Sequence, residues 1–236
     1  MLDDIKQTSF GEVPKEAPRN IEAPGESHLA CVLLLDTSGS MAGEAIESLN
    51  KGINDFITQT AHDEKTCKRV DLAIIEFNDT ARVVQDFVPI RHAEPVKLTA
   101  GGCTAMGQAI NMAIDKVKQK NKDYAALGTP VYQPWIVMIT DGKPTDDISL
   151  ARQRIIEEES KSTHGKLKFW ALGVRGYHKE TLQSLTKRCL ELDGTNFEGF
   201  FDWMRESVAI ISVSRVDDNP PLPPTPEDVH VIPPTW

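Results

Sequence analysis

Two aspartates and a set of hydroxyl side chains stand in this sequence where buried strands are expected to end. The segment Asp36-Thr37-Ser38-Gly39-Ser40 follows an apolar run, and Thr140-Asp141-Gly142 closes a second one. A third segment, residues 99–104, is rich in glycine and ends in Thr104. Carboxylate and hydroxyl oxygens together suit Mg²⁺ or Mn²⁺ and disfavour Zn²⁺. The three segments therefore indicate an oxygen-lined metal site, provided that the fold brings them together.

Convergence of these segments depends on the order of the strands. In an open α/β sheet, ligands bind at the carboxyl ends of the strands. If the runs 28–36 and 135–141 are neighbouring strands, their ends lie about 4.8 Å apart. An isolated D-x-S-x-S is more often a polar loop with a helix-capping serine. The glycine-rich loop and the T-D-G strand end, in the right order, favour the metal site instead.

The segments between residues 27 and 215 alternate between strand-like and helix-like patterns. We expect strands at 28–36, 69–77, 81–88, 135–141 and 167–174, and helices at 43–61, 104–119, 147–162, 179–190 and 200–213. This alternation predicts a doubly wound α/β fold, with a mostly parallel central sheet and helices on both faces. The short connection 78–80 predicts a hairpin, and hence one antiparallel edge strand.

Two proline-containing segments flank this block. Residues 1–26 are expected to form an extended N-terminal arm, and residues 216–236 an acidic C-terminal tail. Seven of the fifteen prolines lie in 217–236, a density that disfavours helix and sheet. The tail is either solvated, packed on its own domain, or a docking segment through the P-x-x-P at 221–224.

The composition excludes several classes of function. With 35 acidic and 26 basic residues the net charge is −9, which argues against nucleic-acid or anionic-membrane partners. No apolar run approaches the roughly 20 residues of a membrane span, and the N-terminus lacks an apolar signal segment, so we expect a cytoplasmic protein. Four scattered cysteines lack the close pairs of a zinc site, and reduced thiols are expected over a disulfide. An acidic chain without an obvious apolar patch is expected to be a monomer.

Three segments carry a resemblance to a known family. DTSGSMAGEAIESLNKGINDF, GGCTAMGQAI and IVMITDGKPTD resemble the segments of von Willebrand factor type A (VWA) domains that form the metal-ion-dependent adhesion site, or MIDAS. All five MIDAS positions match, and the resemblance covers the block 27–215. The M-x-G-x-x-I-x-x-L-N-x-G-I pattern after the serines is similar to bacterial tellurite-resistance-associated members.

The resemblance implies a role for each matched residue. Ser38 and Ser40 would ligate Mg²⁺ through their hydroxyls, and Thr104 directly or through water. Asp36 and Asp141 would act through bound waters and hydrogen bonds to the serines. Mn²⁺ and Ca²⁺ are alternatives. The ion would then bind an Asp or Glu carboxylate of a partner protein. The candidate partner-binding rim consists of Gly102, Cys103 and Lys143.

Neighbouring acids have simpler interpretations. Glu44 is expected to be a charge at a helix N-terminus rather than a ligand for a second ion. Asp146 and Asp147 are expected to cap the helix that follows them.

The resemblance implies a binding module rather than an enzyme, acting in a bacterial stress-response system. One alternative is a Mg²⁺-dependent phosphatase or phosphotransferase. Phosphatases of the haloacid dehalogenase type use D-x-D after the first strand, whereas this chain has Ser38 at the second position. The sequence also lacks a G-x-x-x-x-G-K-[ST] loop and a histidine near the motifs. Another alternative assigns the function to the proline-rich tail, with the rest of the chain as its carrier.

Overall fold

A seven-stranded sheet forms the centre of the computed structural model, which describes residues 21–160 and 167–234. The strands follow the order β3-β2-β1-β4-β5-β6-β7. Their bounds are β1 Leu29–Asp36, β2 Val70–Phe77, β3 Ala81–Pro89, β4 Trp135–Thr140, β5 Lys168–Gly173, β6 Cys189–Leu192 and β7 Val229–Ile232. The five central strands, β2, β1, β4, β5 and β6, run parallel to one another. The two edge strands, β3 and β7, pair antiparallel with β2 and β6.

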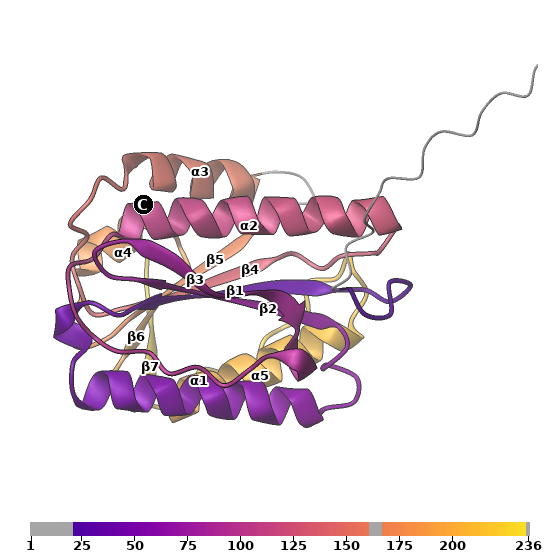
Figure 1. Ribbon diagram of the computed structural model, residues 1–236, viewed down its shortest axis with the longest axis horizontal. Helices are drawn as coiled ribbons and strands as arrows, with labels where there is room; N and C mark the ends of the chain where they lie inside the picture. Colours follow the sequence, from indigo (N-terminus) through magenta and orange to yellow (C-terminus); the bar gives the residue numbers. More distant parts are fainter. Residues whose placement is uncertain (1–20, 161–166, 235–236) are drawn as a thin grey trace, which may run out of the picture.

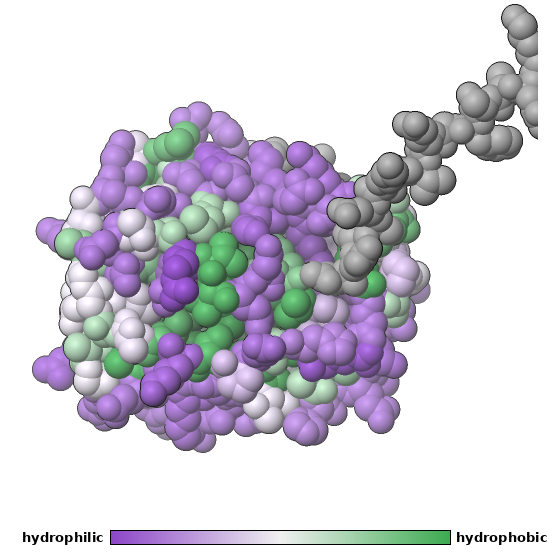
Figure 2. Space-filling model, viewed as in Figure 1, coloured by the Kyte–Doolittle hydropathy of each residue, from purple (hydrophilic) through white to green (hydrophobic). Residues whose placement is uncertain are grey.

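Helices cover both faces of this sheet (Figure 1). The α-helices are α1 Glu44–His62, α2 Met106–Leu127, α3 Ser149–Ser160, α4 Lys179–Leu185 and α5 Glu198–Val213, and the short 3-10 turns are η1 Gly39–Met41 and η2 Ile90–His92. Helices α1 and α5 pack against one face, and α2, α3 and α4 against the other. The space-filling view in Figure 2 shows apolar side chains reaching the surface between these layers, beside β3.

Strand β1 shows why the sheet is buried on both sides. All eight of its residues are buried. Because successive side chains of a strand point to opposite faces, Leu33 and Leu35 join the core beneath α1 and α5. Val32 and Leu34 join the core beneath α2. The continuous apolar run in the sequence thus corresponds to a central strand with a hydrophobic core on each side.

The predicted doubly wound, mostly parallel fold is confirmed, with two corrections. The sheet has two antiparallel edge strands rather than one. The edge strand that the sequence analysis did not predict, β7, lies inside the C-terminal tail, where the proline content was expected to disfavour sheet structure. Its four residues stand between Pro226 and Pro233, and an edge strand needs ladder hydrogen bonds on one side only.

Strand β6 is the second correction. Residues 179–190 were expected to form one helix, but α4 ends at Leu185 and residues from Cys189 onward form β6. Pairing with β5 on one side and β7 on the other decides the conformation of this short apolar segment. Four residues are too few for their periodicity to separate strand from helix.

The described part of the proline-rich segment packs on its own domain. The Trp203 indole N–H donates to the Pro223 carbonyl at 2.9 Å, and Leu222 packs against the core beneath α5. Most of the expected N-terminal arm, residues 1–20, lies outside the described residues. The part that follows is held by ion pairs of Glu22 with Arg91 and of Glu26 with Arg69.

No helix among residues 21–160 and 167–234 combines the length and the apolar character that crossing a membrane requires. Of the cysteines, Cys31, Cys67 and Cys189 are buried, whereas Cys103 is exposed.

Candidate metal site

Strands β1 and β4 are parallel neighbours, as the convergence of the two aspartates requires. Leu35 lies opposite Ile139 in the register, so Asp36 and Asp141 follow at the same edge of the sheet. Helices α1 and α2 also begin at this edge, on the left in Figure 1. The loops that lead into them carry Ser38, Ser40 and Thr104.

The first loop is organised by the Asp36 carboxylate, which is fully buried. Its Oδ1 accepts the Ser38 backbone N–H at 2.8 Å, and its Oδ2 accepts the Thr140 hydroxyl at 2.5 Å. The turn η1 then brings Ser40 next to Ser38, with 3.1 Å between the two Oγ atoms. Ser40 donates to Asp141 Oδ1 at 2.7 Å. A chain of polar contacts therefore links the ends of β1 and β4.

The Thr104 hydroxyl faces the same place, as the surroundings of Gly142 show. A Cβ built on Gly142 would lie 3.2 Å from Thr104 Oγ1 and 3.6 Å from Asp36 Oδ2. Both oxygens thus border one small space that the absent side chain leaves open. The structure brings Thr104 and the four residues of the polar chain into one cluster, as the sequence predicted.

Two buried carboxylates, Asp36 and Asp141, stand close together in this cluster. Burial raises the pKa of Asp36, and the nearby Asp141 charge adds to the rise, against hydrogen bonds from Ser38 and Thr140 that lower it. Burial also raises the pKa of Asp141, against the hydrogen bond from Ser40. Among the described residues, no Lys, Arg or His forms an ion pair with either carboxylate, whose hydrogen-bond partners are Ser38, Thr140 and Ser40.

The three rim residues lie around this edge in different settings. Gly102 has a positive φ of 77°, and its carbonyl accepts the Gly39 N–H at 3.1 Å. Cys103 is exposed, and its hydrogen bond to the Asp79 carboxylate raises the pKa of the thiol. Lys143 is exposed two residues beyond Asp141. Their role in partner binding stays a prediction.

One of the neighbouring acids acts differently from the sequence-based expectation. Asp147 accepts the Ser149 N–H at 2.9 Å and so caps α3, as predicted. Asp146 instead caps α2, accepting the N–H groups of Gly107 at 2.9 Å and Gln108 at 2.8 Å. The α2 N-terminus packs so closely on this loop that a Cβ on Gly107 would lie 2.4 Å from the Asp147 carbonyl oxygen.

Sequence reasoning missed two groups that shape the cluster. Thr140 bonds to Asp36, and its position beside Asp141 in the T-D-G segment was an available signal. Asp79 bonds to the backbone of Cys103 at 2.8 Å, but its place in a short hairpin turn offered no such signal.

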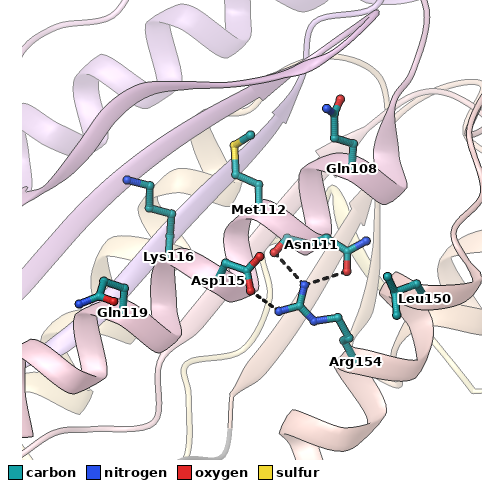
Figure 3. Close-up of a pocket in the computed structure, with 8 residues that line it drawn as sticks. All are labelled: Gln108, Asn111, Met112, Asp115, Lys116, Gln119, Leu150 and Arg154. Atoms are coloured by element: carbon teal, nitrogen blue, oxygen red, sulfur yellow. Dashed lines mark hydrogen bonds and ion pairs between the residues drawn. The ribbon is translucent and has the colours of Figure 1, made fainter.

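A surface hollow lies elsewhere, between α2 and α3 (Figure 3). Its volume is about 800 Å³, and Met112 and Leu150 supply its apolar lining. Arg154 crosses from α3 to the Asn111 side-chain oxygen at 3.0 Å and to the Asp115 carboxylate. The charges of Arg154 and Asp115 are therefore paired with each other, unlike those of the two carboxylates in the cluster at the ends of β1 and β4.

Comparison with known proteins decides the family. The family model of the von Willebrand factor type A domain matches residues 31–198. The chain belongs to the von Willebrand factor type A domain family. No curated protein sequence matches the chain.

Solved structures share the VWA fold at low sequence identity. The pilus adhesin SpaC from Lactobacillus rhamnosus GG has a TM-score of 0.60 at 13% identity, over 80% of this chain and 31% of SpaC. Proximal thread matrix protein 1 from the mussel byssus, in a form with a zinc-occupied MIDAS motif, has a TM-score of 0.55 at 15% identity, over 81% of this chain and 47% of that protein. BatB from Bacteroides thetaiotaomicron scores 0.52 at 17% identity, over 79% of this chain and 100% of BatB. This chain thus spans about a third of the length of SpaC and about half of the mussel protein.

Proposed function

We propose that this VWA domain is a metal-dependent protein-binding module with a MIDAS at the edge described above. The residues that would hold the ion are Asp36, Ser38, Ser40, Thr104 and Asp141. The observation that carries the proposal is the Asp36–Asp141 pair, linked through two serine hydroxyls and lacking a basic partner within the described chain.

The donor set fits a hard divalent cation. Burying carboxylates without a compensating charge is costly, and a bound cation removes this cost. All the donors are oxygens, which favours Mg²⁺, with Mn²⁺ and Ca²⁺ as alternatives. No three His, Cys, Asp or Glu side chains of the described residues gather to hold a metal by themselves. The cluster thus supplies two carboxylates and otherwise neutral hydroxyls.

A cation held in this way keeps much of its charge available to a partner. When bound, the ion supplies a Lewis-acidic position for an Asp or Glu carboxylate of another protein. The exposed Lys143 near Asp141 supports an acidic ligand. The mussel protein shows that a VWA relative can hold zinc in a MIDAS, which supports metal binding without identifying the ion here.

We infer a binding role rather than catalysis. Ser38 occupies the position at which haloacid dehalogenase-type enzymes have a second Asp, and its backbone N–H is engaged by Asp36. The stress-response setting, the cytoplasmic location and the monomeric state stay predictions from the sequence.

Calorimetric titration with Mg²⁺ tests the metal site. Wild type is expected to bind Mg²⁺, and Asp141→Ala to lose that binding. Asp193→Ala is the matched control, because Asp193 is an exposed aspartate that follows β6 and forms an ion pair with His230 of β7, outside the proposed metal site. Absence of Mg²⁺, Mn²⁺ and Ca²⁺ binding by wild type would contradict the proposal.

Capture from a lysate of the source cells then tests the binding role. The baits are wild type in Mg²⁺, wild type in EDTA and Asp141→Ala in Mg²⁺. A protein retained only by the first bait has the expected metal dependence. Equal retention by all three places recognition away from the metal. Deleting residues 217–236 is unsuitable for testing the proline-rich segment, because it removes β7.

A further inference from the structure

The turn between β2 and β3 contacts the loops of the candidate metal site. The Asp79 carboxylate accepts the Cys103 backbone N–H at 2.8 Å. The neighbouring Asn78 carbonyl accepts the Ala105 N–H at 2.7 Å, and the Asn78 amide donates to the Thr37 hydroxyl at 3.4 Å. This turn therefore holds both the D-x-S-x-S loop and the loop that carries Thr104.

Asp79 also fills the space in which a side chain at Gly102 would stand. A Cβ built there would lie 2.7 Å from the Asp79 Cγ and Oδ2 atoms and 2.8 Å from Oδ1. With its φ of 77°, Gly102 exposes its backbone to the carboxylate as other residues rarely can. The Gly102 carbonyl in turn accepts the Gly39 N–H at 3.1 Å, one residue before Ser40.

Thr104 is fixed from the other side by Thr145. The Thr104 N–H donates to the Thr145 hydroxyl at 3.1 Å, and the Thr104 carbonyl accepts the Thr145 N–H at 2.9 Å. The backbone of Thr104 is thus held between Thr145 and the segment 102–103 that Asp79 clamps. Its hydroxyl is directed toward Gly142 and Asp36 as a result.

We propose that Asp79 is a positioning residue of the metal site. Its carboxylate holds the 102–104 backbone so that the Thr104 hydroxyl faces the two aspartates before an ion arrives. The inference rests on the proposed MIDAS function, and it adds a residue outside the five matched positions. Groups of this kind tune metal affinity because they orient the ligands, and their loss commonly lowers affinity by about 10- to 100-fold.

Two variants separate positioning from simple charge attraction. Asp79→Ala removes both the charge and the acceptor for the Cys103 N–H, and is expected to bind Mg²⁺ about 10- to 100-fold more weakly than wild type. Asp79→Asn removes the charge but keeps an oxygen acceptor, and is expected to bind nearly as tightly as wild type. Equal losses in the two variants would refute positioning in favour of charge attraction.

Asp86→Ala is the matched control. Asp86 lies on the same hairpin, accepts the Phe87 N–H at 2.8 Å and pairs with Lys116, but belongs to the body of β3. It should leave Mg²⁺ affinity unchanged. Amide hydrogen exchange in EDTA gives a readout independent of the metal: the Cys103 amide should exchange faster in Asp79→Ala than in wild type or Asp86→Ala.

The outcomes distinguish the two proposals. If wild type binds no divalent ion, the proposed function fails and the positioning role fails with it. If wild type binds Mg²⁺ and Asp79→Ala binds equally well, the positioning role alone is refuted. Thermal unfolding of each variant identifies misfolding. If Asp79→Ala does not fold, Asp79→Leu, which likewise lacks the oxygen acceptor, is compared with Asp79→Asn in its place.

Discussion

The Asp36–Asp141 pair predicts that one substitution reverses its effect on stability when metal is added. In Asp141→Asn, the amide oxygen can still accept the hydrogen bond that Ser40 donates at 2.7 Å. The negative charge, which burial disfavours and which repels Asp36, is removed. Without metal, the free energy of unfolding of Asp141→Asn should therefore equal or exceed that of wild type.

Metal should reverse this order. A ligand at 100 times its dissociation constant adds about 2.7 kcal/mol to the free energy of unfolding. For a domain of about this size, each kcal/mol shifts the Tm by roughly 2–4 °C, so the Tm of wild type should rise by about 5–11 °C. Asp141→Asn, which lacks a carboxylate of the site, should show little rise.

Thermal unfolding in EDTA and in saturating Mg²⁺, at constant ionic strength, measures both effects. Asp193→Asn serves as the control, because that exposed carboxylate lies beside β7 and should leave the response to Mg²⁺ unchanged. The reasoning is refuted if Asp141→Asn in EDTA loses the roughly 1–3 kcal/mol expected when a buried polar group loses its partner. It is also refuted if Mg²⁺ stabilises both proteins equally.

Further predictions concern the glycine beside the site, a buried tyrosine and the last strand. Gly142→Ala should weaken Mg²⁺ binding in calorimetry, because its methyl would lie 3.2 Å from a threonine hydroxyl of the site, whereas Gly101→Ala, with open space around it, should not. Burial, together with a neighbouring carboxylate, raises the pKa of Tyr124 well above its usual range. Above pH 10 the unfolded state therefore releases a proton that the folded state keeps. Between pH 10 and 11 the free energy of unfolding, measured with urea, should fall by about 1 kcal/mol more in wild type than in Tyr124→Phe. Val229→Asp should cost about 3 kcal/mol or more because Val229 is 2% exposed, whereas Val231→Asp, at 65% exposure, should change stability by about 0.5 kcal/mol at most; similar losses in the two variants would contradict the placement of β7.

The local patterns of the sequence were sufficient to predict most of the elements and the composition of the site. The continuous apolar runs of β1 and β4 predict strands buried on both faces, because successive residues are hydrophobic when both sides of a strand are covered. A carboxylate or hydroxyl that follows such a run then lies at the carboxyl end of a central strand. The sequence could therefore place Asp36 and Asp141 at the same ends of their strands, but their convergence required β1 and β4 to be neighbours.

The tertiary structure alone decided how distant groups share their hydrogen bonds. Asp146 precedes α3 yet caps α2, and Asp79 belongs to a hairpin yet holds Cys103, because packing brings their acceptors to unpaired N–H groups far along the chain. Strands β6 and β7 are equally dependent on context, since each has only four residues and gains its conformation from its neighbours in the sheet. Periodicity records whether a segment is buried, but a contact between separate segments depends on the order and register of the strands that carry them, which no local pattern contains.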